Sequence, residues 1–352
     1  MACCFPIQAP VHIDSEDNCL KYFDGKSGIW FNVVQFDDSP FHYLTKYSSV
    51  AIDGQLYVAG GRGGREDADV KKSFCCYDMD DGFSQEILPD MQTTRSACSL
   101  VHMDNYIYAI GGVESITGDS ETPTLSVERY NLNREQLDIR AASWETVASL
   151  PSDVWNPHAV VFKGKLLVCG TTRNISQVLR DQFLIAMAMV NRADIDYVLC
   201  IYDPKSNTWQ RHILEPRQLI TCMQGRQNYA MLHIHNGECY LLGNVMIDAY
   251  HNPRTKWFRT TVNKLEFREL DDGSLTFLQT GPSLSQDDVG GSHYYSSYFC
   301  IDNDLFIKSK GVFQLGVKTT DDNMHEVLDL WHSFPCRYLS SFGAVTFDRD
   351  VV

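Results

Sequence analysis

The sequence predicts an all-β fold built from repeated antiparallel units. Three observations support this. Short segments alternate apolar and polar residues, a hairpin phrase ending in glycines recurs along the chain, and a second phrase with Tyr-Asp and Trp follows it. The chain has 352 residues, of which 44% are hydrophobic and 21% charged. That balance is typical of a folded globular protein, and one large all-β domain fits the length.

The first phrase is a β-hairpin whose second strand ends in a glycine pair. Its clearest copies are 48–61, ending in Gly60 and Gly61, and 96–112, ending in Gly111 and Gly112. Weaker copies are 158–171 with Gly170, 230–244 with Gly243, and 298–310, which has lost both glycines. A tight-turn dipeptide such as Asp-Gly joins the strands of each copy. We expect the glycines to adopt positive φ and to let backbone pass close by.

The second phrase is a strand ending in Tyr-Asp, then a polar turn and a strand that carries an aromatic residue. The cleanest copy has Tyr202, Asp203 and Trp209. The other copies are Tyr22–Asp24 with Trp30, Tyr77 and Asp78 with Phe83, Tyr130 and Asn131 with Trp144, Phe267 with Phe277, and Val327–Leu330 with Trp331. Together the two phrases give four strands per unit at a spacing of about fifty residues or more, which is the spacing of propeller blades.

These residues resemble the kelch repeat, whose signature is a glycine pair, then Tyr-Asp, then Trp. The resemblance extends from about residue 11 to 347 and is greatest to the kelch domain of the BTB–kelch adaptor family. It implies one six-bladed kelch β-propeller over 1–352, with blades at about 44–92, 93–152, 155–215, 226–282 and 292–338, and one blade from 10–43 plus 340–349. We expect the strand at 342–348 to pair with the strand near 10–14, closing the ring without an open sheet edge.

The long connections between strands indicate where a partner binds. In such a unit, the connections from the second to the third strand lie at the same end as those between units. These second-to-third connections are long, at 62–73, 113–125, 171–197, 244–261 and about 309–326. Long loops in compact domains are usually functional, so we expect this loop face to bind a partner. Within 171–197, the composition of 176–190 predicts a helix, either packed on the rim or binding a partner.

Several side chains near this face are candidates for partner binding. Arg95 matches the arginine at which BTB–kelch domains contact acidic or polar peptides, and its alternative role is to satisfy loop carbonyls. Arg226 lies one residue out of step with the equivalent place, and Arg62 and Arg65 lie in a mixed-charge loop. Aromatic candidates offer the contact area that interface hot spots use, with core packing as the alternative: Trp155, Tyr294, Tyr295 and Tyr43.

The charge balance limits the partners. The formal net charge of −15 argues against nucleic acid and against an anionic membrane surface, and favours a neutral or locally basic protein. The family resemblance implies a protein-interaction domain that recruits substrates to a cullin-RING ubiquitin ligase, joined through a BTB domain absent from this chain. An actin-associated kelch protein and a propeller enzyme acting on a small molecule are the alternatives.

No familiar catalytic or metal-binding motif is present, so we expect no enzyme activity, no cofactor and no metal. His233 and His235 are the nearest approach to a ligand pair, because residues two apart on a strand share a face. The twelve cysteines form no C-x-x-C pattern. They predict reduced thiols buried in the core and a cytoplasmic location.

Overall fold

The computed structural model describes residues 7–14, 19–24, 29–35, 46–63, 69–78, 84–118, 120–133, 143–172, 197–214, 230–235, 237–248, 256–270, 275–279, 284–285, 297–301, 304–308, 312–320, 323–332 and 343–347. The chain forms two compact units. Unit 1 comprises residues 1–147 and 296–352, and unit 2 comprises residues 148–295. Over the described ranges every regular element is a β-strand, which confirms the predicted all-β fold. Accordingly, no helix long and apolar enough to cross a membrane occurs in that part of the chain.

Unit 1 contains four large antiparallel sheets and one separate hairpin in its described residues. The first sheet has the order β27-β1-β2-β3, from Gly343–Phe347, Ile7–Asp14, Cys19–Asp24 and Ile29–Gln35. The second runs β4 to β7, from Ser48–Ile52, Gln55–Ala59, Phe74–Asp78 and Ser84–Leu88. The third has the order β13-β12-β9-β8, from Trp144–Thr146, Val127–Asn131, Tyr106–Ile110 and Ser99–Met103.

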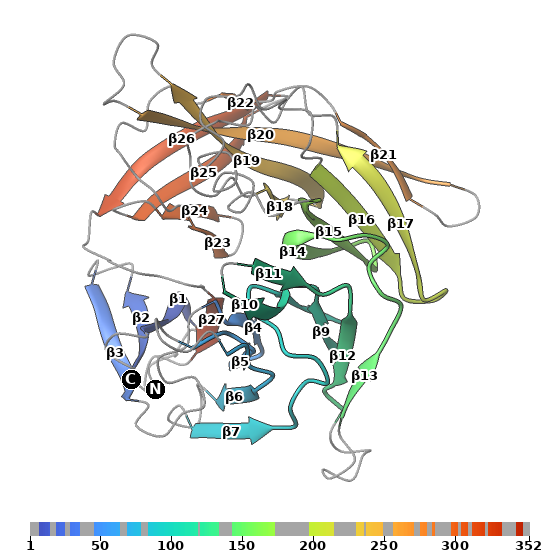
Figure 1. The fold of residues 1–352 in the computed structure, drawn as a ribbon. Helices are drawn as coiled ribbons and strands as arrows, with labels where there is room; N and C mark the ends of the chain where they lie inside the picture. The colour runs from blue at the N-terminus through green and yellow to red at the C-terminus, as the bar shows by residue number, and fades with distance from the viewer. Residues whose placement is uncertain are drawn as a thin grey trace. The chain divides into compact units, whose positions relative to one another are not determined.

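The fourth large sheet of unit 1 runs β23 to β26, from Ser297–Ile301, Asp304–Lys308, Val312–Thr320 and Asn323–His332. The separate hairpin pairs β10 (Val113–Thr117) with β11 (Ser120–Pro123). Figure 1 shows β27, the last strand, beside β1, the first, and their register pairs Val11 with Gly343 and Ile7 with Phe347. The two ends of the chain therefore contribute to one sheet.

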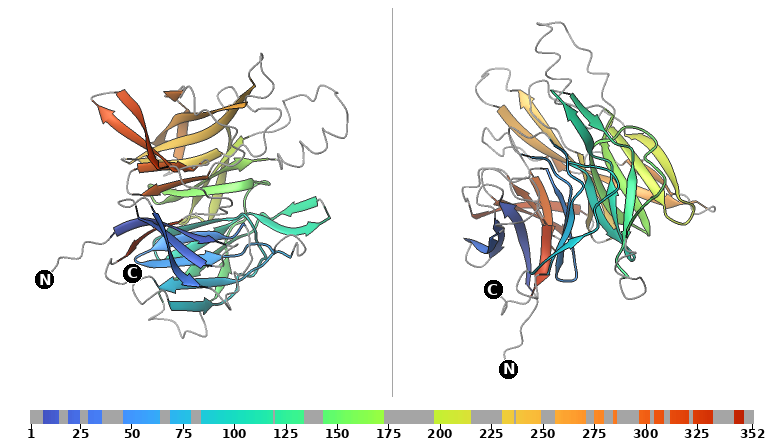
Figure 2. Two further views of the ribbon diagram at one scale, coloured as in Figure 1. Left: turned by 90° about the vertical axis from the view of Figure 1, so that its left-hand side faces the viewer. Right: turned by 60° about the horizontal axis from the view of Figure 1, so that its bottom comes forward.

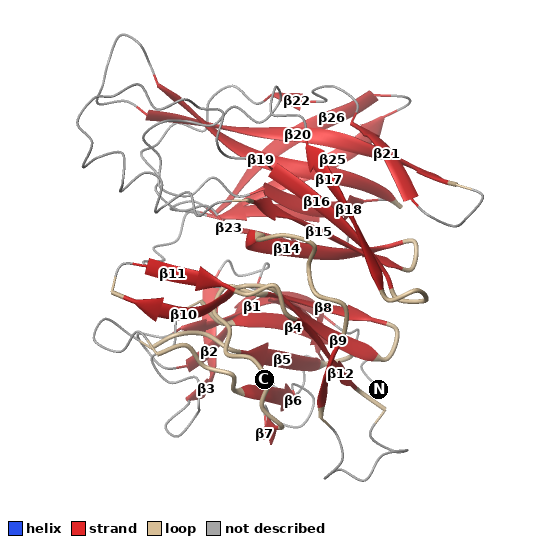
Figure 3. Cartoon of the chain, turned by 45° about the vertical axis from the view of Figure 1, so that its right-hand side comes forward, coloured by secondary structure: helices blue, strands red, loops and turns tan. Residues whose placement is uncertain are grey.

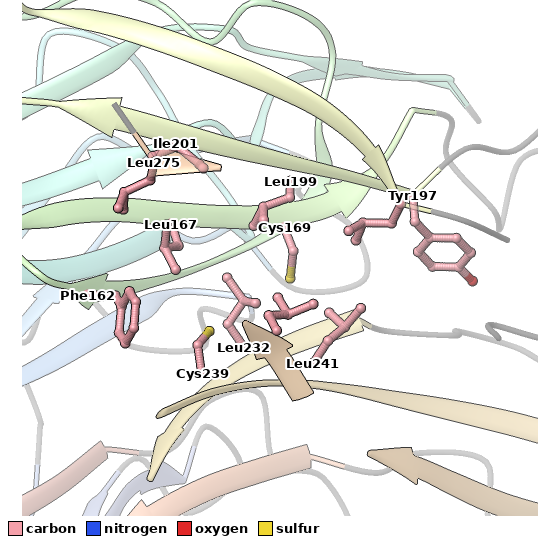
Figure 4. Packing of buried hydrophobic residues seen from close by; sticks show 12 residues of the cluster. Phe162, Leu167, Cys169, Tyr197, Leu199, Ile201, Leu232, Cys239, Leu241 and Leu275 are labelled. Carbon is pink, nitrogen blue, oxygen red and sulfur yellow. The ribbon is translucent and has the colours of Figure 1, made fainter. Parts of the chain in front are cut away.

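Unit 2 contains two sheets. One runs β14 to β17, from Trp155–Phe162, Lys165–Thr171, Tyr197–Asp203 and Thr208–Leu214. The other runs β18 to β21, from Ala230–His235, Glu238–Asp248, Lys256–Glu269 and Leu275–Gln279, and β22 (Leu284–Ser285) also pairs with β20. Its buried core lies between the two sheets, and Figure 4 shows Cys169 and Leu199 from one sheet near Leu232 and Leu241 from the other.

The strands follow the predicted repeat. All five predicted hairpins form, as β4–β5, β8–β9, β14–β15, β18–β19 and β23–β24. Second strands such as β5 and β9 are buried along nearly their whole length, whereas the fourth strand β7 is exposed at its first four residues. The exposed strand is the edge of its sheet, and the buried strands lie inside it, which is why the second strand reads as an unbroken apolar run.

Two connections of the earlier repeats differ from the sequence prediction. Residues 113–125, expected to be a loop, form the hairpin β10–β11. Much of 244–261, also expected to be a loop, extends β19 and β20, whose register pairs Asn244 with Thr260 and Asp248 with Lys256. Both segments carry β-branched residues, such as Ile116, Thr117, Val245 and Ile247, which favour strands. The predicted helix at 176–190 lies outside the described residues.

The last repeat was assigned wrongly from the sequence. Val327–Leu330, predicted to be the third strand, lies in β26, the fourth strand. The third strand is β25, which occupies part of the expected loop at 309–326 and pairs with β24 and β26. This repeat has lost both its glycine pair and its Tyr-Asp, so no residue marked where its strands begin.

The turn and glycine geometry explains why these residue types recur. Asp53 and Gly54, and likewise Lys163 and Gly164, both have positive φ, as the type I′ turn of a two-residue hairpin requires. Gly60 also has positive φ (65°), and a Cβ placed there would overlap the carbonyl oxygen of Arg95. Only glycine therefore allows the start of the neighbouring sheet to approach so closely.

Candidate functional site

Four connections of two neighbouring sheets meet in unit 1. Arg62 follows β5, and its Nη1 lies 2.8 Å from Oε1 of Glu121 on β11. Lys46, just before β4, lies 3.8 Å from the same oxygen. Thr94, before β8, donates a hydrogen bond of 2.8 Å to the carbonyl of Glu114 on β10. We call these five residues the loop cluster.

The hairpin β10–β11 carries the most exposed part of the loop cluster. Figures 2 and 3 show it extending beyond the ends of β8, β9 and β12. Its register pairs Ser115 with Thr122 and Thr117 with Ser120, so these four hydroxyl residues share one face, and all four are exposed. The other face carries Ile116 and Glu121, which are half-buried. The hairpin is therefore held through Glu121 on one side and offers polar side chains to solvent on the other.

Beneath the loop cluster lies a fully buried ion pair between Arg95 and Glu128. Nη2 of Arg95 is 2.8 Å from Oε1 of Glu128, and both side chains are 0% exposed. The guanidinium also donates to the carbonyls of Gly111 (2.9 Å) and Ser126 (2.7 Å) and to Oγ of Ser126 (2.8 Å). The carboxylate accepts two further bonds, from the backbone amides of Gln92 and Thr93. The pair thus fixes the connection before β8 to the ends of β9 and β12.

This geometry favours the structural role for Arg95 over the partner-binding role. Its guanidinium satisfies loop carbonyls and a carboxylate, and none of the side chain is exposed to a partner. The expectation that Arg95 contacts a bound peptide is therefore corrected: burial and four hydrogen bonds occupy the group. Its resemblance to a binding arginine rested on sequence position, which does not reveal whether a side chain points outward or inward.

The remaining predicted residues fall into two groups. Arg62 lies in the loop cluster, while Trp155 on β14 is only 9% exposed and its side chain is mostly buried in unit 2. The others lie outside the described residues: Arg226, Tyr294, Tyr295, Tyr43 and Arg65. The sequence analysis missed Glu128, Glu121 and Lys46. A comparison of the repeats could have revealed Glu128, because it is a carboxylate at a position where β6 has Cys75 and β16 has Cys200.

The repeated Tyr and Trp residues form cross-strand pairs near the turn between the third and fourth strands of their own sheets. Tyr130 pairs in register with Trp144, and Tyr202 with Trp209. Nε1 of Trp144 donates to the carbonyl of Pro89 at 3.0 Å, and that of Trp209 to the carbonyl of Ala148 at 2.7 Å. Each acceptor follows the last strand of the preceding repeat. The second phrase therefore ties each of these sheets to the segment that leads into it.

The described cysteines behave as core residues. Seven of them are buried thiols: Cys19, Cys75, Cys76, Cys98, Cys169, Cys200 and Cys239. Burial raises the pKa of Cys75, Cys200 and Cys239 to about 12, so these thiols stay protonated near neutral pH. For these seven, the prediction of reduced thiols in the core is confirmed. Across the described residues, no group of three His, Cys, Asp or Glu side chains is arranged to hold a metal ion.

Comparison with known proteins supports the kelch resemblance. The Kelch motif family matches residues 94–151, the repeat that contains Arg95, Glu128 and Trp144. Kelch-like protein 25 of Xenopus tropicalis is 27% identical over 165 residues, covering 47% of this chain and 24% of that protein. Kelch repeat and BTB domain-containing protein 8 of the same species is 32% identical over 126 residues, covering 34% of this chain and 19% of that protein. The matched region is thus about a fifth to a quarter of each relative.

The structure of YjhT is similar over most of its length. The match covers 91% of this chain and 94% of the YjhT chain, with a TM-score of 0.57 and 14% sequence identity. At that identity the likeness shows the fold alone. It also corrects the expectation that the chain is not an enzyme, because the fold shared with YjhT does not exclude enzyme activity. Missing catalytic motifs therefore do not exclude enzyme activity for this fold.

Kelch repeats and these relatives support a protein-interaction domain with protein partners. The chain carries a kelch motif, it has the all-β fold of a kelch-type propeller, and its relatives are Kelch-like and BTB–kelch proteins.

Proposed function

We propose that this chain binds a partner protein or peptide through its loop face, of which the loop cluster is the described part. The observation that carries the proposal is the meeting of four connections there, with Glu114 exposed and Lys46 and Arg62 partly exposed. Connections held together by ion pairs form a continuous surface, whereas isolated loops do not. Such a surface loses less conformational entropy when a partner binds.

The charge of the chain defines the partner further. A net charge of −15 attracts a neutral or locally basic segment and repels an acidic one. Glu114 is exposed on the hairpin, while the two cations of the loop cluster already face Glu121. The surface therefore suits a partner whose contact region carries Lys or Arg together with hydrogen-bonding groups.

The finer proposal is that the chain is the substrate-recognition part of a cullin-RING ubiquitin ligase adaptor in the cytoplasm. One matched relative is named for kelch repeats together with a BTB domain, and this chain corresponds to only part of that protein. A BTB domain outside this sequence would supply the link to the cullin. The six large sheets would be the blades of one closed propeller, with β27 and β1 sharing a blade.

Cross-linking to a captured partner tests the surface. Lysine-reactive cross-linking followed by mass spectrometry compares Lys46 and Lys72, beside the loop cluster, with Lys163 and Lys205, in turns at the other end of their own sheet. We expect partner cross-links on Lys46 and Lys72. Cross-links confined to Lys163 and Lys205 would place the partner on turns of unit 2 instead of on the loop cluster and overturn the proposal.

A second experiment separates the adaptor from the cytoskeletal alternative. Co-purification of the full-length protein with a cullin supports the adaptor, and co-sedimentation with actin filaments supports the alternative. A variant with Glu114→Lys and Arg62→Glu reverses charges of the loop cluster without touching the buried ion pair. It should lose the substrate but keep the cullin, because the proposed cullin link lies outside this chain.

A further inference from the structure

One repeat position joins the first strands of neighbouring sheets. Ser48, Ser99 and His158 each stand five residues before the first turn residue of their hairpin, which is Asp53, Asp104 and Lys163 respectively. Each residue two places earlier has positive φ: Lys46 (54°), Ala97 (51°) and Asn156 (50°). The backbone therefore enters the first strand in the same way in three repeats, and the side chains at this position start from equivalent places.

In unit 1 the residue at this position, Ser48, helps to link the start of β4 to the residues just before β8. We call such a link a joint, and none of the groups in this one changes its charge near neutral pH. Oγ of Ser48 donates to the carbonyl of Cys98, just before β8, at 2.6 Å. The thiol of Cys98 lies 3.3 Å from the same hydroxyl, and the amide of Ala97 donates to the carbonyl of Lys46 at 2.7 Å. A hydroxyl and backbone groups keep their hydrogen-bonding roles from pH 5 to pH 8.

In unit 2 the residue at the same position is His158, whose side chain is an imidazole. The backbone amide of Leu232 on β18 donates to Nδ1 of His158 on β14, at 3.2 Å. Both strands are the first of their sheets and lie at a sheet edge, where backbone groups lack a strand partner on one side. The bond fixes the tautomer, because Nδ1 accepts only when the proton is on Nε2 of a neutral ring.

We propose that His158 makes the joint between the two sheets of unit 2 acid-sensitive. A protonated imidazole carries N–H groups on both nitrogens, so Nδ1 would face the Leu232 amide as a second donor. The bond is present while the imidazole is neutral and is lost when the ring becomes protonated on Nδ1. The joint in unit 1, with Ser48 at the same position, does not change in this way.

The other described cysteines and histidines near His158 do not produce the same pH effect. Cys169, opposite His158 on β15, and Cys239 on β19 are fully buried thiols whose pKa burial raises, so neither becomes charged between pH 5 and 8. His212 on β17 also lies between the two sheets, with its ring 5.1 Å from that of Phe277 on β21. Desolvation by burial lowers the pKa of His212. On β18 itself, His233 adjoins Leu232 in the sequence.

Hydrogen exchange of the Leu232 amide tests the proposal in the whole chain. Its protection factor, corrected for the intrinsic effect of pH, is compared at pH 7.5 and pH 5.5, with the Ala97 amide of unit 1 as internal control. We expect at least an approximately fivefold loss of protection for Leu232 at the lower pH, the equivalent of one net hydrogen bond. Ala97 should stay unchanged. An unchanged Leu232 amide, or an equal loss at Ala97, would overturn the proposal.

Two variants assign the effect to His158. His158→Asn keeps an acceptor near the position of Nδ1 that does not titrate, so protection of Leu232 should persist at both pH values. His158→Leu removes the acceptor, so protection should be low at both. Persistence of the pH effect in His158→Asn, or its disappearance in His212→Phe or His233→Phe, would assign it to another histidine. If a variant does not fold, the comparison of Leu232 with Ala97 in the unmodified chain still decides.

Discussion

Arg95 in unit 1 and Val154 in unit 2 hold the same repeat position, four residues before Ser99 and His158 respectively. Each is 0% exposed. Arg95 donates to the carbonyl of Gly111, and Cγ1 of Val154 lies 2.5 Å from where a Cβ of the equivalent Gly170 would stand. The two side chains therefore occupy the same place against the end of the second strand, one as a cation and one as an aliphatic group.

The residue that the third strand places at this site also differs between the two repeats. Glu128 in β12 stands opposite Arg95, whereas Cys200 holds its position in β16 of unit 2 and is fully buried. One repeat fills the site with an ion pair, and the other fills it with apolar groups. A buried ion pair repays its desolvation only when every hydrogen bond is made, so an apolar pair can be equally stable. The comparison indicates that the repeat requires a filled site and tolerates either chemistry.

The largest effect expected is the loss of one partner of the buried pair. Glu128→Ala leaves the Arg95 guanidinium buried without its carboxylate, and Arg95→Ala leaves the carboxylate buried alone. Each should lower the free energy of unfolding by about 3–5 kcal/mol. This differs from the expectation for an exposed binding residue, whose removal would leave stability unchanged. Chemical denaturation of the two variants measures the loss.

The double variant Arg95→Val with Glu128→Cys sharpens the comparison, because it copies the residues of unit 2 into unit 1. We expect a loss of less than about 2 kcal/mol, far below the sum of the single losses. Additive losses would show that the two repeats are not interchangeable at this site, and would contradict our interpretation.

Next in size is the effect of a methyl group at Gly60. Gly60→Ala combines positive φ with overlap on the carbonyl of Arg95, and should cost about 3 kcal/mol. Gly118, in the turn of the β10–β11 hairpin, is a matched control with a φ of 59° and no atom within 4 Å of the added Cβ. Gly118→Ala should cost about 1 kcal/mol from backbone strain alone. Equal losses in thermal unfolding would mean that the close approach of the two sheets does not matter.

A smaller effect is expected from the indole hydrogen bonds, which are equivalent in the two units. Trp144→Phe loses the bond to Pro89, and Trp209→Phe loses the bond to Ala148. Each bond is worth about 1 kcal/mol. Trp144→Phe should lower the free energy of unfolding more than Trp209→Phe. Trp144 is 2% exposed and its ring packs edge-on against Phe74 at 4.9 Å, whereas Trp209 is half-buried. Urea denaturation should rank the variants in that order, and the reverse order would contradict it.

The smallest effect concerns Asp203 in unit 2. A hydrogen bond from Lys165 lowers the pKa of the Asp203 carboxyl, while partial burial opposes the shift. The ion pair therefore contributes stability above the pKa of an unfolded aspartate, about 4, and loses it as the pH falls through the lower folded value. Asp203→Asn should cost less than about 1 kcal/mol at pH 7, and the cost should shrink as the pH falls below about 4. A difference that stays constant with pH would rule out the ion pair as its cause.

Pattern alone located the repeats that keep their signatures. The hairpins at 48–61 and 96–112 formed as predicted, because alternating side chains and a tight turn specify a hairpin locally. The final repeat was misassigned because Val312–Thr320 has no glycine pair or Tyr-Asp to mark its strand. Candidate site residues were predicted less well. Arg62 falls in the loop cluster, but Arg95 is buried, since position in a repeat does not report the direction of a side chain.

The sequence by itself determined the strands, their hairpin turns and the glycines between them, because each depends on contacts within a few residues along the chain. The tertiary structure decided which side chains are buried and which are paired. Glu128 became the partner of Arg95 only when β12 paired beside β9 in their sheet, and Leu232 became the partner of His158 only when the two sheets of unit 2 packed together. Such partners depend on the register and packing of whole sheets, and no local pattern encodes those distances.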